Sequence, residues 1–232
     1  MYSCPWSFVK DEKKHIISLV GGGGKTTIMY ELAQFFAAQG RKTAVMTTTH
    51  IWKPKENSLA RSVQQMEALW QQGTYAVIGN LEQGTNKLTA PSAFLLEHTL
   101  VASDIVLSEA DGAKQMPCKV PAEHEPVLLA ASDIVIAVVG MDALGKTIGE
   151  ACFRWQLAKH IFASECNFLL DENKLAKLIL SEQGSRKNVC ARDFYVALNK
   201  CDVAEKAHVQ ALQDILLEHG VAKEKIWLRG KR

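Results

Sequence analysis

The sequence predicts an α/β fold in which a mostly parallel, doubly wound sheet is flanked by helices. Short apolar, β-branched runs alternate along the chain with segments whose apolar residues recur at helical spacing. The runs are unbroken rather than alternating, which is typical of strands buried on both faces. With 232 residues, of which 47% are hydrophobic, we expect a single domain over 1–232.

Seven strands are expected, with helices between most of them. The strands are HIISLV (15–20), KTAVMTTT (42–49), TYAVIGN (74–80), DIVLSEA (104–110), DIVIAVVG (133–140), DFYVALN (193–199) and KIWLRG (225–230). Helical spacing predicts helices over 26–39 and 204–219, each closed by a glycine. A helical insertion is expected at 149–182. It comprises two helices, GEACFRWQLAKHIFA and DENKLAKLILSEQ, the second with Asp171 at its N-cap.

Composition limits the classes of partner and the location. The formal net charge is +2 and no stretch collects Lys and Arg without interleaved acids, so nucleic acid and anionic membranes are not expected partners. No apolar run approaches the roughly 20 residues that span a bilayer. The N-terminus lacks the pattern of a secretory signal, and the six cysteines are scattered. We therefore expect a cytoplasmic protein with free thiols.

The run of four glycines in VGGGGKTT (20–27), called the glycine loop, has the composition of a phosphate loop. It follows the first expected strand and opens the first expected helix. Glycines let backbone N–H groups turn toward an anion, and the helix N-terminus adds a positive end. In such a loop the lysine reaches the β- and γ-phosphates, the first threonine holds Mg²⁺ and the second contacts the α-phosphate. The predicted nucleotide-binding residues are Gly21, Gly22, Gly23, Gly24, Lys25, Thr26 and Thr27.

The spacing of the loop departs from the commonest form. G-x-x-x-x-G-K-[ST] requires glycine at position 19, which is Leu19, so the loop is the shortened G-x-x-G-K-T-T. This shorter loop resembles that of ATP-dependent Mur-type ligases, and GGGGKTT is also similar to the loop of the SIMIBI class of NTPases. Val20 stands where that class often has an extra lysine, so a lysine donated across a dimer is not expected.

Two carboxylates end the strand DIVLSEADG. A carboxylate at this position can hold Mg²⁺ through water or polarise an attacking water, and the following Gly112 lets backbone approach a γ-phosphate. The stretch resembles the E-x-x-G or D-x-x-G element of P-loop GTPases. We predict that Glu109 and Asp111 act together with Lys25 in catalysis, and that both carboxylates and Thr26 hold the metal.

The segment 193–205 contains a candidate base reader, Asn199-Lys200-Cys201-Asp202. It matches the N-K-x-D element of GTPases, in which a carboxylate accepts hydrogen bonds from two guanine donors that adenine lacks. Asn199, Lys200 and Asp202 are therefore predicted to bind the nucleotide and to favour GTP. The alternative is that Asp202 only caps the following helix, in which case the bound nucleotide could equally be ATP.

Two loops are expected to respond to the nucleotide or to contact a substrate. TTTHI (47–51) follows the second strand, and the long polar loop 111–126 follows the strand end described above. Cys118, Glu123 and His124 could also ligate a metal, although no spacing singles one out. The predicted switch or substrate residues are Thr49, His50, Gly112, Lys114, Lys119, Glu123 and His124.

The combination LVGGGGKTT, TTTHI, EADGAKQMPCKVPAEHEPV and NKCD, in this order, resembles the YqeC family, over about residues 15 to 205. The resemblance implies a P-loop NTPase that acts as an accessory factor in the maturation of selenium-dependent molybdenum hydroxylases. The residues that match the family are Lys25, Thr26, Glu109, Asp111 and the loop 117–126.

Three functions are compatible with these features. The favoured one is an accessory protein that binds Mg²⁺ and GTP, hydrolyses the nucleotide slowly, and acts on a client metalloenzyme or its maturation factors. The second is an ATP-dependent small-molecule kinase or ligase, in keeping with the shortened loop. The third is a non-catalytic carrier of selenium or metal that uses the cysteines and His124. A homodimer is left open.

Overall fold

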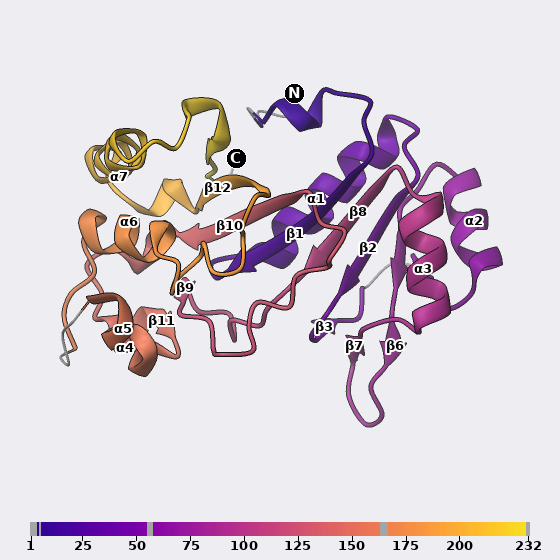
Figure 1. Cartoon of the computed structure of the whole chain (residues 1–232), viewed down its shortest axis with the longest axis horizontal. Helices are drawn as coiled ribbons and strands as arrows, with labels where there is room; N and C mark the ends of the chain where they lie inside the picture. The colour runs from indigo at the N-terminus through magenta and orange to yellow at the C-terminus, as the bar shows by residue number, and fades with distance from the viewer. Residues whose placement is uncertain (1–3, 5, 55–57, 163–166, 231–232) are drawn as a thin grey trace.

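The computed structural model describes residue 4 and residues 6–54, 58–162 and 167–230. Its centre is an eight-stranded sheet with the order β13-β12-β10-β1-β8-β2-β5-β4, in which every neighbouring pair is parallel (Figure 1). The strands are β1 (His15–Gly21), β2 (Thr43–Thr47), β4 (Leu59–Ala60), β5 (Ala76–Ile78), β8 (Ile105–Glu109), β10 (Ile134–Gly140), β12 (Asp193–Asn199) and β13 (Ile226–Leu228). The α/β class and the seven expected strands are confirmed. The two-residue β4 is additional.

Helices cover both faces of this sheet. They are α1 (Lys25–Ala38), α2 (Val63–Gln71), α3 (Ala93–Ala102), α6 (Glu172–Leu180) and α7 (Lys206–Glu218), whereas the four-residue helices α4 (Ile148–Ala151) and α5 (Lys159–Phe162) lie beside the 152–158 segment. Successive residues of β1 enter different cores, because side chains alternate along a strand. Leu19 packs in the core beneath α1, whereas Val20 packs in the core beneath α6 and α7. In Figure 1, α2 and α3 lie at the opposite end of the sheet from α6 and α7.

The helix ends follow the sequence signals. Gly40 and Gly220 follow α1 and α7 with φ of +77° and +82°, as expected of C-terminal glycines. Asp171 caps α6, and its Oδ1 accepts a hydrogen bond from the Lys174 N–H at 2.8 Å. Among the described residues, no helix is long and apolar enough to cross a membrane.

Two small sheets were not predicted. One is antiparallel, with the order β3-β7-β6, and consists of β3 (Ile51–Trp52), β6 (Asn80–Leu81) and β7 (Lys87–Thr89). It lies beyond the end of β2 (Figure 1). The other pairs β9 (Cys118–Lys119) with β11 (Cys152–Phe153) in parallel.

The first helix expected in the 149–182 insertion is wrong in extent. The structure has the four-residue α4, then β11, a 3-10 turn (Trp155–Ala158) and the four-residue α5; residue 163, the expected end, lies outside the described residues. Pairing of β11 with β9 extends the backbone in the middle of the segment. Arg154 follows with a φ of +60°, which no helix accommodates.

Candidate functional site

The glycine loop joins β1 to α1, and close backbone packing explains its glycines. Gly21, Gly23 and Gly24 have φ of +93°, +72° and +117°. A Cβ atom on Gly23 would lie less than 3.0 Å from the backbone nitrogen of Gly140, and one on Gly22 would lie 2.6 Å from the Met116 carbonyl oxygen. The loop is therefore pressed against the ends of two other chain segments, where only glycine fits.

Hydrogen bonds decide which backbone donors of the loop can meet a ligand. The Gly22 N–H donates to the Val138 carbonyl at 2.9 Å, and the Gly23 N–H donates to the Met116 carbonyl at 2.8 Å. These two groups are thus engaged within the protein. The first N–H groups of α1 have no acceptor inside the helix, and the residues that carry them line a cavity. That helix terminus attracts anions through its dipole.

Lys25, Thr26, Glu109 and Asp111 come together beside the loop, because β1 and β8 are neighbours in register, with Leu19 opposite Glu109. The Thr26 hydroxyl donates to Glu109 Oε2 at 2.7 Å. Lys25 Nζ donates to the Gly21 carbonyl and lies 3.1 Å from Asp111 Oδ1 and 3.8 Å from Glu109 Oε1. Asp111 also accepts from the Gly21 N–H at 3.2 Å. Two carboxylates, one ammonium and one hydroxyl therefore form a single polar cluster.

The electrostatic state of Glu109 follows from its surroundings. Burial raises the pKa of this carboxyl above its ordinary value, while Lys25 and the Thr26 hydroxyl lower it in part. A divalent cation beside Glu109 would, like Lys25, lower the pKa of this carboxyl and so favour its charged form.

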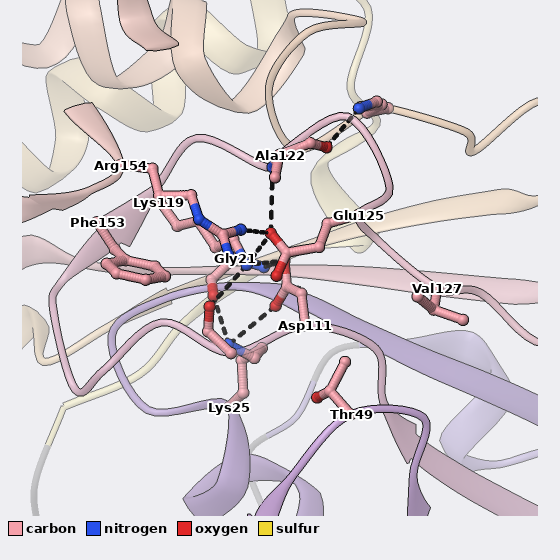
Figure 2. Close-up of polar contacts among 12 residues, drawn as sticks. Gly21, Lys25, Thr49, Asp111, Lys119, Ala122, Glu125, Val127, Phe153 and Arg154 are labelled. Carbon is pink, nitrogen blue, oxygen red and sulfur yellow. Dashed lines mark hydrogen bonds and ion pairs between the residues drawn. The ribbon is translucent and has the colours of Figure 1, made fainter. Parts of the chain in front are cut away.

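A buried network of alternating charges extends from this cluster (Figure 2). Lys119 Nζ lies 2.6 Å from Glu125 Oε2 and 3.5 Å from Asp111 Oδ2, and it donates to the Gly112 carbonyl at 2.6 Å. Glu125 Oε2 also accepts from Arg154 and from the Ala122 N–H. The network connects the glycine loop with the 111–126 loop and with β11.

Lys119 and Glu125 hold each other in the charged state. Burial lowers the pKa of Lys119, an effect that the charges of Asp111 and Glu125 oppose. Burial alone would raise the pKa of Glu125, but hydrogen bonds from Lys119 and Ala122 and the charge of Arg154 outweigh it, so this pKa is lowered. Glu125 and Arg154 were not among the predicted site residues. Arg154 lies 29 residues from Glu125 in the chain, so no local pattern marks the pair.

The end of β12 reaches the glycine loop through Asn199. Its Nδ2 donates to the Gly23 carbonyl at 2.7 Å, and its Oδ1 accepts from Arg229, whose Nε donates to Glu31 at 3.0 Å. Lys200 forms an ion pair with Asp142 at 2.7 Å. Sequence reasoning missed Arg229, which follows β13.

Asp202 is exposed and lies in a 3-10 turn, next to the backbone at Gly230. Helix α7 begins only at Lys206, with Glu205 at its N-cap position. The alternative interpretation of Asp202 as the cap of this helix is therefore wrong.

A cavity of about 850 Å³ opens beside the loop. Its walls come from the glycine loop, the TTTHI segment, β7, the 112–116 segment and the end of β12. The lining residues are Gly22, Gly23, Gly24, Lys25, Thr26, Thr27, His50, Ile51, Trp52, Lys87, Glu109, Gly112, Ala113, Lys114, Gln115, Met116 and Lys200.

Several predicted switch or substrate residues lie elsewhere. Lys119 is buried in the charge network, and Glu123 and His124 are exposed and do not line the cavity. Thr49 is half-buried and turns back on the chain, its N–H donating to Thr47 Oγ1 at 3.0 Å. Of that group, the cavity is lined by His50, Gly112 and Lys114.

A protein-only metal centre does not emerge from the part of the chain that the structure describes, where no three His, Cys, Asp or Glu side chains are grouped to hold an ion. Two cysteines in that part of the chain also favour the thiol. Burial raises the pKa of Cys4 to about 12 and that of Cys201 to about 11. Protonated thiols are poor ligands for metal or selenium, so Cys4 and Cys201 do not support the carrier function.

Comparison with known proteins gives the family. A model of the YqeC protein family matches residues 17–156. The uncharacterized protein YqeC of Escherichia coli (strain K12) is 32% identical over 224 residues, which cover 92% of this chain and 86% of that protein. No solved structure matches. The chain therefore belongs to the YqeC family.

Proposed function

We propose that this protein binds and hydrolyses a nucleoside triphosphate with Mg²⁺, favours GTP, and acts as an accessory factor in the maturation of selenium-dependent molybdenum hydroxylases. The observation that carries the nucleotide proposal is the polar cluster of Lys25, Thr26, Glu109 and Asp111. It lies at the N-terminus of α1 and at the edge of a cavity large enough for a small-molecule ligand.

The residues present fit a magnesium ion. Thr26 Oγ1 and Glu109 Oε2 lie 2.7 Å apart, and both are hard oxygen ligands. Magnesium in nucleotide sites is held by one or two protein oxygens, with water and phosphate oxygens completing its shell. Thr26 and Glu109 would hold the ion, Asp111 would accept from its bound water, and the ion would neutralise charge on the phosphates.

Lys25 has the position to bind phosphate. Its ammonium contacts the Gly21 carbonyl and Asp111 at the base of the cavity. A triphosphate at the α1 N-terminus would offer this ammonium a stronger acceptor than a neutral carbonyl. Asp111 keeps the Gly21 N–H and Lys119 as partners when Lys25 turns outward.

The guanine preference rests on Asn199 and Asp202. Asn199 bridges the end of β12 to the glycine loop, which supports an N-K-x-D element held close to the proposed phosphate site. Asp202 is exposed beside Gly230 and can accept from the paired donors of guanine. Arg229 fixes the orientation of the Asn199 amide.

The charge network would communicate the state of the nucleotide. Lys119 fixes the Gly112 carbonyl, whose backbone is next to the expected γ-phosphate position, and it also holds Glu125 and thereby Arg154. A change at Asp111 on nucleotide binding would reach the 119–127 segment through Lys119. The role in hydroxylase maturation comes from the resemblance to the family motifs and not from the geometry.

The experiment is equilibrium binding of Mg²⁺-GTP and Mg²⁺-ATP to wild type, Asp202→Ala and Glu205→Ala. Glu205 is an exposed carboxylate three residues further along the chain, at the start of α7, and serves as the matched control. Guanine reading predicts a preference for GTP of at least about a hundredfold that Asp202→Ala abolishes and Glu205→Ala retains. Equal binding of both nucleotides by wild type would exclude this reading.

The second candidate, an ATP-dependent small-molecule kinase or ligase, is favoured by one observation. The cavity extends past the glycine loop to the β3-β7 sheet and so has room for a second molecule. A phosphorylated or ligated small-molecule product, detected by mass spectrometry after incubation with Mg²⁺-ATP and a metabolite extract, would support it.

A further inference from the structure

The cavity wall opposite the glycine loop is formed by the small antiparallel sheet. In its register, Ile51 faces Leu88 and Trp52 faces Lys87. Ile51 and Leu88 are buried in the core beneath α1. Because side chains alternate across a strand, Trp52 and Lys87 project from the opposite face, and both line the cavity.

Trp52 contributes little to the folded core, since 58% of it is exposed. The Lys87 ammonium lies 5.3 Å from the centroid of its ring, a cation–π distance. Among the described residues, Lys87 forms no ion pair with a carboxylate. The cavity therefore presents a largely exposed indole ring together with a lysine that has no carboxylate partner among the residues that the structure describes.

The remaining charges of the cavity also favour an anion. Lys25, Lys114 and Lys200 line it together with Lys87, and the imidazole of His50, also in the lining, lies 3.4 Å from Glu82. Glu109 is the one carboxylate in the described lining. Lys25 and Lys200 already have carboxylate partners. Lys114 stands 5.3 Å from the Phe153 ring and, like Lys87, has no ion-pair partner in the described chain.

Sheet order separates this wall from the base reader. Strand β12, which carries Asn199, lies on one side of β1, and strands β8 and β2 lie on the other. The β3-β7 wall follows β2. A nucleotide with its phosphates at Lys25 and its base toward Asn199 would therefore leave the Trp52 side vacant, next to the terminal phosphate.

We propose that Trp52 and Lys87 form a second binding site, for a planar aromatic or heteroaromatic small molecule that carries a carboxylate or phosphate. The ring stacks on Trp52 and the anionic group pairs with Lys87. The position of this site beside the terminal phosphate rests on the proposed function. The stacking platform and its charge rest on Trp52 and Lys87 alone.

The test uses the full chain labelled with 5-fluorotryptophan and observed by ¹⁹F NMR, with the Trp52 resonance assigned through Trp52→Phe. The probe is 2-naphthoate, and 2-naphthamide and cyclohexanecarboxylate serve as a neutral and a non-aromatic control. Each titration is done without nucleotide and with Mg²⁺ and the non-hydrolysable β,γ-methylene analogue of GTP. Lys87→Gln is compared with Lys53→Gln, an exposed neighbouring lysine that does not line the cavity.

We expect 2-naphthoate to shift the Trp52 resonance in a saturable way, with nucleotide present or absent. Lys87→Gln should raise the Kd about tenfold, because a charged partner is replaced by a neutral one, and the two controls should bind about tenfold more weakly. Lys53→Gln should bind like wild type.

The proposal fails if Trp52 does not respond, or if the two lysine variants behave alike. It also fails if the nucleotide analogue displaces 2-naphthoate and itself shifts Trp52, because Trp52 would then stack the nucleobase. Should the analogue not bind at all while 2-naphthoate binds as expected, the proposed nucleotide function fails and the second site stands.

Discussion

Removal of the Lys119 ammonium is expected to destabilise the protein strongly. The Lys119 side chain is 0% exposed, and its Nζ contacts Glu125, Asp111 and the Gly112 carbonyl. In Lys119→Met the apolar stem is retained, but Glu125 keeps only Arg154 and the Ala122 N–H. Breaking one partner of a buried ion pair costs about 3–5 kcal/mol. Because Arg154 still neutralises Glu125, we expect the lower end, about 3 kcal/mol.

The assay is urea unfolding at pH 7, followed by circular dichroism, with the slope of the transition compared between variants. Lys187→Met is the matched control. This half-buried lysine donates to the carbonyls of Ala122 and Glu123 in the same loop, and its loss should cost about 1 kcal/mol. The double variant Lys119→Met/Glu125→Gln removes both charges, so it should be no less stable than Lys119→Met.

A loss below about 1 kcal/mol in Lys119→Met would refute this account of the network. The account would also be refuted if the double variant lost as much stability as Lys119→Met and Glu125→Gln added together, because the two charges would then act independently.

Two further predictions concern stability. Gly23→Ala should lower the free energy of unfolding by about 3 kcal/mol, because the added Cβ would meet the Gly140 backbone. Gly40→Ala has a similar positive φ but nothing within 4 Å of its Cβ, so it should cost about 1 kcal/mol. Chemical unfolding measures both values, and equal losses of stability would contradict the packing argument. Hydrogen bonds to Asp133 (2.6 Å) and Asp11 (3.0 Å) raise the pKa of His15, so its stabilisation is complete below the unfolded pKa of about 6.5 and is lost as pH rises through the folded value. Relative to wild type, His15→Gln should therefore lose about 1 kcal/mol more of its free energy of unfolding at pH 5.5 than at pH 9. The difference is modest because the Asp133 side chain is half exposed. A loss of stability that grows as pH rises would contradict this assignment.

The sheet could be predicted because its strands carry strong local sequence signals. Helices α2 and α3 carry only weak ones and were not predicted. Helix α3, AFLLEHTLVA, is apolar around its circumference and leaves Phe94 and Val101 exposed, so it has no clear amphipathic period. In α2 only Met66 is fully buried. The β3-β7-β6 strands are two or three residues long, too short for an alternation to be recognised.

The same division applies to the candidate site. Lys25, Thr26, Glu109 and Asp111 follow adjacent parallel strands, so local motifs and sheet topology bring them together. Arg154 and Arg229 reach the site from distant segments through tertiary packing that no local pattern encodes. Lys119 was expected to face the ligand, but Glu125 in the same loop draws it into the interior.

Whether the glycine loop binds a nucleotide is the central question, and calorimetric titration of the wild-type protein with GTPγS, in Mg²⁺ and in EDTA, tests it most directly. Lys25→Ala is compared with Lys146→Ala, the lysine of the second G-K-T at 145–147, which lines a separate cavity. We predict Mg²⁺-dependent binding that Lys25→Ala weakens by at least about a hundredfold and Lys146→Ala leaves unchanged. Binding that survives Lys25→Ala, or that is lost in Lys146→Ala instead, would contradict the account.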